Sequence, residues 1–510
     1  MGVVRTRAVA LLGMDGSIVE IEADYSSQLP SFVIIGLPDA ALGEAKDRVQ
    51  TAVANSGLEL PSRRLTVNLS PASLPKHGSG FDLAIAIAAL GAAGKIDPTT
   101  TEKVVHLGEL GLDGRLRPIP GILPAVATAV AAGIETVMVP SGNAREAELV
   151  PNARIVPVAS LRDAAIWHGA QLEPIVVDPI LNSTVSVEES RQIDFADVVG
   201  GTEAIEAMVV AAAGGHHAML LGPPGSGKTM LAERLPGILP DLDVHAALEV
   251  SSVRSLSGMA VGDRLQSRPP FEAPHHTATA ASLIGGGSRN IRPGAAARAS
   301  GGVLFLDEAP EFNSSVLDSL RQPLESGVIT INRANAVAHF PGKFQLLLAA
   351  NPCPCGQYGA RDSECTCPPA ARRRYLGRLS GPLLDRIDIQ LRVERVTTAA
   401  LRISTEGPRI TTAVAKTRVQ EARAASKSRL EGTPWDRNSM VPGSWLRGSK
   451  FRLEPNRTRT LDRALERGGI TMRGYDRVLR LAWTLADLEA ATRPTSDHIG
   501  RALYLRKGIM

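Results

Sequence analysis

The chain has 510 residues, of which 44% are hydrophobic and 4% aromatic, and its formal net charge at pH 7 is +4. This length accommodates two or three domains with full cores, and no apolar run approaches the roughly 20 residues that span a bilayer. We therefore expect a cytoplasmic α/β protein with no membrane partner. The total charge hides an asymmetry. Residues 401–510 hold 22 Lys and Arg against 11 Asp and Glu, a net of +11 that leaves −7 for the first 400 residues.

Residues 1–185 alternate between strand and helix periodicity. The apolar runs Phe32–Ile35 and Thr136–Val139 predict strands, and the Ala-rich stretch Asp82–Ala93 predicts a helix. The pattern predicts an α/β domain over residues 1–185, with a polar linker near Val177–Gln192 that leads into the next domain.

The most specific motif follows the apolar run Ala218–Leu221 and precedes a predicted helix that begins near Met230. It is a complete phosphate-binding loop, G-x-x-x-x-G-K-[ST], formed by Gly222, Pro223, Pro224, Gly225, Ser226, Gly227, Lys228 and Thr229. Glycines let backbone N–H groups turn towards phosphate oxygens, and the helix N-terminus favours negative charge. We expect Lys228 to contact the β- and γ-phosphates and Thr229 to hold Mg²⁺. The chain is predicted to bind ATP with Mg²⁺.

Two later apolar strands end in polar side chains. Val303–Leu306 is followed by Asp307 and Glu308, and Phe344–Ala350 is followed by Asn351. Asp307 is predicted to hold the metal, Glu308 to activate the attacking water, and Asn351 to lie between that water and the γ-phosphate. Parallel sheets place ligands at the carboxyl ends of their strands, so these tips and the phosphate loop predict one site for ATP hydrolysis.

Two segments interrupt this core. Arg268–Thr277, which contains His275 and His276, leads into the glycine triplet at residues 285–287. The segment is interpreted as an ordinary loop, and metal binding by the two histidines is the alternative. Residues 327–341 show a strand–turn–strand pattern that predicts a hairpin, and Arg333 in its turn is a candidate DNA contact.

All four cysteines lie within 15 residues, in the pattern C-x-C-x₉-C-x-C: Cys353, Cys355, Cys365 and Cys367. Four clustered thiolates predict a structural Zn²⁺ site, although the spacing differs from the usual C-x₂-C. Free or redox-active thiols are the alternative, and a reducing cytoplasm disfavours disulfides.

The C-terminal part, residues 396–510, is predicted to be mostly helical. Its helices are expected at Thr412–Ala425, Asn456–Arg467, Gly474–Ala491 and Ser496–Leu505. Its basic excess indicates a polyanionic partner, nucleic acid above all, and a solvated Arg-rich helical face is the alternative.

Together these motifs resemble the AAA+ ATPases, and within them the magnesium-chelatase-like family of the ComM type. The resemblance runs from about residue 30 to the C-terminus. It rests on Asp197–Gly200, Gly222–Thr229, Ala273–Thr277, Gly302–Phe312, Arg321–Gly327, Asn351–Gly356 and Ser380–Ile389. It implies an AAA+ core over 195–395 and a helical lid over 396–510. It also implies a homo-oligomer, a hexameric ring helicase that drives DNA branch migration in recombination and transformation. A chelatase-like or chaperone-like ATPase that remodels a protein partner is the alternative.

The resemblance also assigns two arginines. Leu384–Asp388 is similar to the arginine-finger motif of that branch, which implies that Arg386 reaches a neighbouring subunit's γ-phosphate. Thr471–Asp476 is similar to the sensor 2 motif, which implies a nucleotide-sensing role for Arg473.

The N-terminal domain resembles the proteolytic domain of Lon, an S5-like α/β fold, through Pro75–Asp82 and the segment 108–121. Lon needs a nucleophilic Ser and an activating Lys. An ungapped alignment places Gly80 and Leu123 at those positions, although Ser79 is adjacent. We expect a non-proteolytic scaffold that binds DNA or stacks on the ring.

Overall fold

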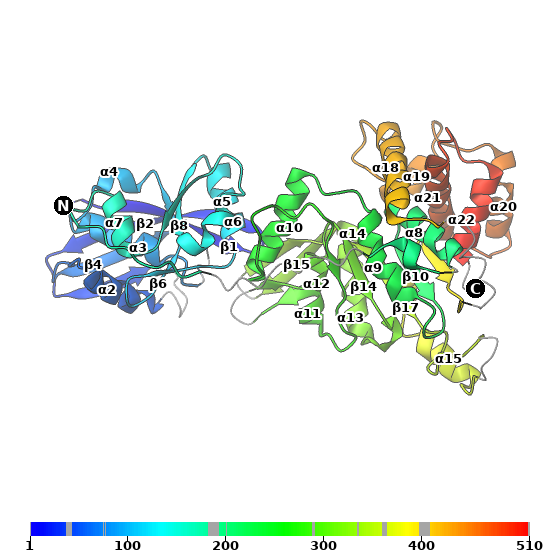
Figure 1. Ribbon diagram of the computed structural model, residues 1–510, viewed down its shortest axis with the longest axis horizontal. Helices are drawn as coiled ribbons and strands as arrows, with labels where there is room; N and C mark the ends of the chain where they lie inside the picture. Colours follow the sequence, from blue (N-terminus) through cyan, green and yellow to red (C-terminus); the bar gives the residue numbers. More distant parts are fainter. Residues whose placement is uncertain are drawn as a thin grey trace.

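The computed structural model describes residues 2–36, 43–74, 76, 78–181, 193–199, 201–287, 291–333, 336–359, 365–396 and 409–507. It is elongated, with the N-terminal domain at one end, the nucleotide-binding core in the middle and a helical bundle at the other end (Figure 1). Most of the expected linker, residues 182–192, and Gly200 lie outside the described residues.

The N-terminal domain is built on a seven-stranded mixed sheet in the order β3-β4-β2-β1-β5-β8-β9. The antiparallel pair β1 and β2 forms its centre, and β5, β8 and β9 extend it in parallel. The strands are β1 (Val4–Leu12), β2 (Asp15–Ser26), β3 (Ser31–Ile35), β4 (Arg64–Ser70), β5 (Val105–His106), β8 (Thr136–Pro140) and β9 (Arg154–Val158). The main helices are α2 (Ala45–Asn55), α3 (Asp82–Ala92), α5 (Ile122–Ala131) and α7 (Leu161–Trp167).

Helix α3 is the central core element of this domain, because every one of its residues is buried. It is apolar on all sides, as a fully enclosed helix must be. Its first residue, Asp82, accepts two hydrogen bonds from Arg48, at 2.8 and 3.0 Å. Burial raises the pKa of Asp82 to about 6, and Arg48 opposes that rise.

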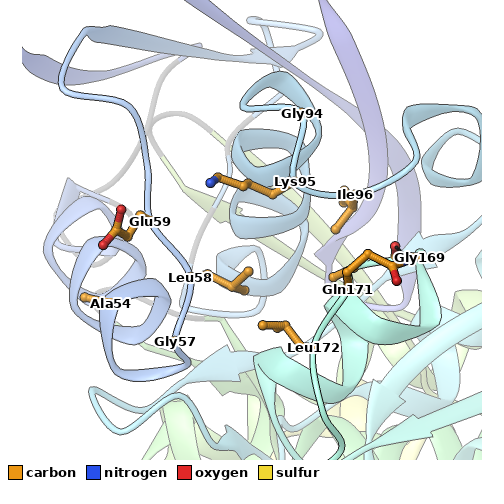
Figure 2. Close-up of a pocket in the computed structure, with 11 residues that line it drawn as sticks. Ala54, Gly57, Leu58, Glu59, Gly94, Lys95, Ile96, Gly169, Gln171 and Leu172 are labelled. Atoms are coloured by element: carbon orange, nitrogen blue, oxygen red, sulfur yellow. Dashed lines mark hydrogen bonds between the residues drawn. The ribbon is translucent and has the colours of Figure 1, made fainter.

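A pocket of 680 Å³ lies in this domain, beside the ends of α2, α3 and α7. Its charged lining residues are Glu59 and Lys95 (Figure 2). Each of the three helix ends is followed by a glycine with positive φ, at Gly57, Gly94 and Gly169. The pocket is lined only by residues of the N-terminal domain.

The core is a five-stranded parallel sheet in the order β11-β14-β17-β10-β18. The strands are β10 (Ala218–Leu221), β11 (Phe271–Glu272), β14 (Val303–Leu306), β17 (Gln345–Ala350) and β18 (Ile389–Arg392). Buried clusters fill both faces. The longer helices are α8 (Thr202–Gly214), α9 (Lys228–Ile238) and α10 (Val244–Leu256). Helix α15 (Pro369–Leu376) projects from the body of the core (Figure 1).

The predicted hairpin is present as β15 (Val328–Arg333) and β16 (Ala336–Pro341), paired in antiparallel register. Two residues of its turn, Ala334 and Asn335, lie outside the described residues. One prediction about the core inserts was wrong. Arg268–Thr277 is not simply an inserted loop, since it contains the edge strand β11, whose two residues are too few to show a periodicity.

In the part of the chain that the structure describes, the N-terminal domain contacts the core through the β1–β2 turn and through the region around Gly121. The β1–β2 turn meets β16, where the Met14 amide donates to the His339 carbonyl at 3.0 Å and Asp15 pairs with the His339 ring. At the second contact the Gly121 amide donates to the Ser255 carbonyl of α10 at 3.1 Å. Here Glu146, in the short helix α6 (Ala144–Ala147), has its pKa raised to about 7 by burial, with Ser255 opposing the rise.

The C-terminal residues form a helical bundle that packs on α8, α9 and β18. Its helices are α18 (Thr412–Arg429), α19 (Gly443–Leu446), α20 (Pro455–Glu466), α21 (Met472–Leu488) and α22 (Ser496–Lys507). The four predicted helices are present, with boundaries displaced by up to four residues. Within the described residues no helix is both long and apolar enough to cross a bilayer.

Candidate nucleotide site

The phosphate loop connects β10 to α9 at the carboxyl edge of the sheet. Gly225 and Gly227 adopt φ angles of +75° and +87°, which glycine adopts without strain. A Cβ built on either glycine meets no atom within 4 Å, so the loop encloses open space. Gly222 is tightly packed instead, because a Cβ there would lie 2.2 Å from the Val393 carbonyl oxygen.

Lys228 lies at the centre of this loop. Its ammonium donates to the carbonyls of Gly222 and Pro223, at 2.8 and 3.0 Å, and to the Asn351 Oδ1 at 3.3 Å. Burial lowers the pKa of Lys228, and Asp307 and Glu308 counteract that effect. The structure thus brings Lys228 and Asn351 into direct contact across two neighbouring strands.

The two residues predicted to hold Mg²⁺ also meet. Thr229 Oγ1 donates to Asp307 Oδ2 at 2.9 Å, and the other Asp307 oxygen accepts from the Glu308 amide at 2.9 Å. A hydroxyl and a carboxylate so placed are the oxygen ligands that Mg²⁺ prefers. With the open phosphate loop beside them, these groups fit a Mg²⁺–nucleotide complex, in which the metal would neutralise charge on the phosphates.

Glu308 has a strained backbone, with φ of +50° in a non-glycine residue. Such strain persists where surrounding structure fixes it, and it concentrates at functional sites. Its carboxylate lies 3.5 Å from the Nδ1 of His276. Glu308 is half exposed, with 52% of its side-chain surface accessible, which leaves room for a water molecule whose proton it would accept.

His276 lies in a turn, as the loop interpretation of its segment expects, but the sequence does not predict its contact with Glu308. It follows β11, which pairs in parallel with β14 through Phe271–Val303 and Glu272–Leu304. The carboxyl ends of β11 and β14 therefore deliver His276 and Glu308 to the same edge. Had the short strand been recognised, its placement beside the acidic strand would have predicted this contact.

Arg386, the arginine-finger candidate, and Arg473, the sensor 2 candidate, lie at the opposite edge of the sheet. Ile389 pairs with Ala218, and the Asp388 amide donates to the His217 carbonyl at 3.0 Å, which places Arg386 beyond the amino end of β10. At 3.3 Å per residue, the four residues of β10 put about 13 Å between that end and the phosphate loop.

Arg386 forms an ion pair with Glu325 and donates to the Pro382 carbonyl at 2.5 Å. Burial lowers its pKa, and the charges of Arg321, Arg477 and Arg473 add to this effect. Arg473 is 79% exposed and lies 3.5 Å from Asp385. The structure thus groups Arg386 with Arg473 and separates both from the phosphate loop of their own chain.

A buried carboxylate supports this arginine group. Asp388 accepts from the ring of His216 at 3.0 Å and forms an ion pair with Arg477 of α21. Burial alone would raise the pKa of Asp388, but Arg477 and His216 outweigh it and hold that pKa well below its usual range. His216 also contacts Thr484 of α21 at 2.8 Å, so the core and the C-terminal bundle share one polar network.

Arg333 lies apart from both groups. It ends β15 and is exposed, and a side chain at Gly286 would meet its guanidinium at 3.5 Å. The hairpin therefore lies against the strand β12 (Gly285–Gly286) of the glycine triplet.

The four cysteines converge, although no disulfide joins them. Their sulfur atoms all lie within 4.8 Å of one another. A backbone hydrogen bond from Gln357 and contacts with the other thiols lower the pKa of Cys355 to about 6. Among the described residues, these four cysteines are the group of three or more His, Cys, Asp or Glu side chains whose ligand atoms lie close enough together to hold a metal ion.

The positions aligned with the Lon dyad carry no catalytic pair. Leu123 is fully buried, and Ser79 hydrogen-bonds to the Glu109 carboxylate. Lys76 is the lysine nearest to Ser79 in the sequence. Its ammonium group donates to the carbonyls of Gly36 and Leu74, at 2.9 and 3.0 Å, and to that of Pro71.

Comparisons with known proteins cover nearly the whole chain. Residues 194–401 match the family described as magnesium chelatase, subunit ChlI, while 21–143 and 409–506 match two further ChlI families, the latter its C-terminal part. A segment of 176 residues is 25% identical to the Lon protease of Mycolicibacterium smegmatis, over 32% of this chain and 22% of the protease.

Full-length relatives are also found. An uncharacterised protein of Mycobacterium tuberculosis is 46% identical over 508 residues, 99% of each chain. The competence protein ComM of Haemophilus influenzae is 37% identical over 98% of this chain and 96% of its own. The uncharacterised protein YifB of Escherichia coli is 36% identical over 99% and 97%. The chain therefore belongs to the magnesium-chelatase-like AAA+ ATPases of the ComM and YifB family, whose members use ATP and Mg²⁺.

Proposed function

We propose that this protein is an ATP-hydrolysing ring motor that acts on DNA, a branch-migration helicase, and that its ring is a homohexamer in the cytoplasm. The observation that carries the motor assignment is the placement of Lys228, Thr229, Asp307 and Asn351 around one loop, with Arg386 at the far edge of the same sheet. A subunit built this way completes its hydrolytic site only with an arginine from a neighbour.

In this scheme Lys228 and Asn351 contact the γ-phosphate, and Thr229 and Asp307 hold Mg²⁺. Glu308 takes a proton from water, and His276 orients Glu308. Arg386 and Arg473 are presented to the adjoining subunit. An arginine supplied in trans typically contributes about 10³–10⁵ in rate, so assembly would control turnover.

DNA as the partner is supported by an arginine stripe along α20, which we define as Arg459 and Arg463 of the helix and Arg467 at its C-cap. All three are exposed, and they recur every four residues, so successive arginines lie about 6 Å apart along one helix face. Among the described residues none of the three guanidinium groups has an ion-pair or hydrogen-bond partner. A row of exposed arginines is complementary in charge to a row of backbone phosphates, which is how proteins bind nucleic acid without reading its sequence.

The test measures ATP turnover with and without single-stranded, duplex and branched DNA, and movement of a labelled four-way junction. The variants are Glu308→Gln, a triple Arg459/Arg463/Arg467→Ala, and a matched triple Arg63/Arg145/Arg154→Ala in the N-terminal domain. Both triples remove three exposed positive charges. We expect junction movement that Glu308→Gln abolishes. The α20 triple should bind DNA at least about tenfold more weakly, with a shallower salt dependence, while the matched triple should not.

The alternative is a chelatase-like ATPase that remodels a protein, and the described ChlI similarity favours it over other classes. ATP turnover that ignores every DNA, with equal behaviour of the two triples, would select this alternative.

A further inference from the structure

We propose that Cys353, Cys355, Cys365 and Cys367 bind one Zn²⁺ ion, and that this ion fastens the loop after Asn351 to both the phosphate loop and α15. The site would be structural, with the metal enclosed by four sulfurs, and ATP hydrolysis would depend on it. This inference does not depend on DNA being the partner.

Three of the sulfur–sulfur separations are close to those of a tetrahedral metal site, and the Cys367 sulfur lies within 4.8 Å of the other three. Cys353 lies 3.3 Å from Cys355 and 3.6 Å from Cys365, and Cys355 lies 3.7 Å from Cys365, all between sulfur atoms. Four ligands on a Zn²⁺ ion at about 2.3 Å stand about 3.8 Å apart. A disulfide would instead require about 2.05 Å. The separations are thus too long for a bond between sulfurs and close to those around a shared ion.

The local backbone supports this convergence. The Gly356 amide donates to the Cys353 carbonyl at 2.9 Å, closing a turn that brings Cys355 back beside Cys353. Gly356 has φ of +75°, the left-handed conformation that such a turn needs. Cys353 is fully buried and Cys355 is exposed, so the site lies at the surface with one ligand anchored in the core.

The cluster contacts the phosphate loop through Gly356. A Cβ on Gly356 would lie 2.6 Å from the Cδ of Pro224, so the cysteine loop rests directly on the phosphate loop. On its other side, the cysteine loop begins at Asn351, whose amide oxygen contacts Lys228.

The cysteine cluster is also connected to α15. Cys367 is followed directly by Pro368, the N-cap of α15. The hydroxyl of Tyr375, near the other end of α15, faces the backbone amide of Asn351. A metal held between the two C-x-C pairs would join the residues that follow Asn351 to the start of α15. The contact between Tyr375 and Asn351 would hold the other end of α15.

Zinc is the metal that this donor set favours. Four thiolates in tetrahedral arrangement select Zn²⁺ or iron, and they exclude Mg²⁺ and Ca²⁺, which take oxygen ligands. The two candidates differ in colour and in iron content, so a single purified sample distinguishes them.

The first experiment measures the metal content of the full-length protein purified without chelators. We expect about one Zn²⁺ per chain, and Co²⁺ in its place should give the absorption bands of tetrahedral cobalt thiolate. Because the chain has only four cysteines, thiol titration reports on this cluster alone. Metal below about 0.2 per chain, together with four freely reactive thiols, would overturn the proposal, and so would iron in place of zinc.

The second experiment separates the metal from its effect on catalysis. Cys365→Ser should lose the ion and at least about tenfold of ATP turnover. Arg374→Ala, an exposed residue of α15, should change neither. Circular dichroism verifies folding in each variant. Full turnover in folded Cys365→Ser without metal would contradict the coupling.

Discussion

The Thr229 hydroxyl donates to the Asp307 carboxylate at 2.9 Å, which joins the first turn of α9 to the tip of β14. This contact brings together the two residues that are predicted to hold Mg²⁺. We predict that Asp307→Asn weakens nucleotide binding in Mg²⁺ at least about tenfold, because a neutral amide attracts the ion less strongly. Binding in EDTA should be nearly unchanged. Fluorescent-nucleotide titrations in both buffers measure the difference, and equal losses in both would point to a collapsed phosphate loop instead.

Glu308→Gln should lower the rate of ATP hydrolysis roughly 10²–10⁴-fold and leave nucleotide affinity intact, because only the proton acceptor is lost. Steady-state phosphate release, with affinity measured in parallel, checks this prediction. A variant that hydrolyses normally would exclude Glu308 as the base.

His276→Ala should lower turnover by roughly ten- to a hundredfold, less than Glu308→Gln, since it removes orientation and not the base itself. His275→Ala is the matched control, because His275 contacts Thr277 at 2.9 Å, whereas His276 is the histidine of the pair that lies beside Glu308. Identical phosphate-release rates for the two histidine variants would remove His276 from the site.

Arg386→Ala should lower turnover about 10³-fold, and a partner subunit should restore it. Glu308→Gln carries an intact arginine but cannot hydrolyse, while Arg386→Ala carries an intact hydrolytic site. Mixing the two inactive proteins should therefore recover activity at the junctions where the arginine of one meets the phosphate loop of the other. No recovery in mixed assemblies, verified by differential tagging, would place Arg386 outside the trans role.

Gly13→Ala should loosen the contact between the N-terminal domain and β16. Gly13 has φ of +66°, and a Cβ there would lie 2.6 Å from the His339 carbonyl oxygen. Gly133→Ala is the control, because Gly133 has φ of +81° and open space around its Cβ position. Both variants carry the cost of a left-handed alanine, of the order of 1 kcal/mol, so a larger fall in thermal midpoint for Gly13→Ala isolates the clash.

Glu146→Gln should stabilise the protein at alkaline pH. The pKa of Glu146 rises from 4.5 to about 7 on folding, so the folded state binds its proton more tightly and loses stability as pH rises across that interval. The glutamine variant lacks this loss. Thermal midpoints of the two proteins should nearly agree at pH 4.5 and diverge, in favour of the variant, by pH 8. A constant difference across this range would contradict the assignment.

The sequence predicts how the residues of the candidate nucleotide site are brought together, because its signals are local. The loop from Gly222 to Thr229 and the tips Asp307 and Asn351 each follow a buried strand, and parallel pairing of those strands is enough to bring them together. The fold class follows from the same alternation of strands and helices, which long apolar elements such as α3 make plain.

The parts that the sequence could not predict depend on short elements or distant contacts. Strand β11 has two residues, too few for a period, so the position of His276 was hidden. The partner of Arg386 is Glu325, 61 positions away, and nothing in either segment specifies the pairing. The turn that gathers the cysteines depends on Gly356, whose left-handed φ becomes visible only in three dimensions.

The Asp388 network gives the C-terminal bundle a mechanical role. Arg477 and Thr484 lie on one helix, α21, which also carries Arg473 in its first turn. Through Asp388 and His216, that helix is joined to the segment carrying Arg386. A rotation of the bundle would therefore displace Arg386 and Arg473 together. In the proposed ring, such a movement would link the nucleotide state of one subunit to the arginines that it offers to the next.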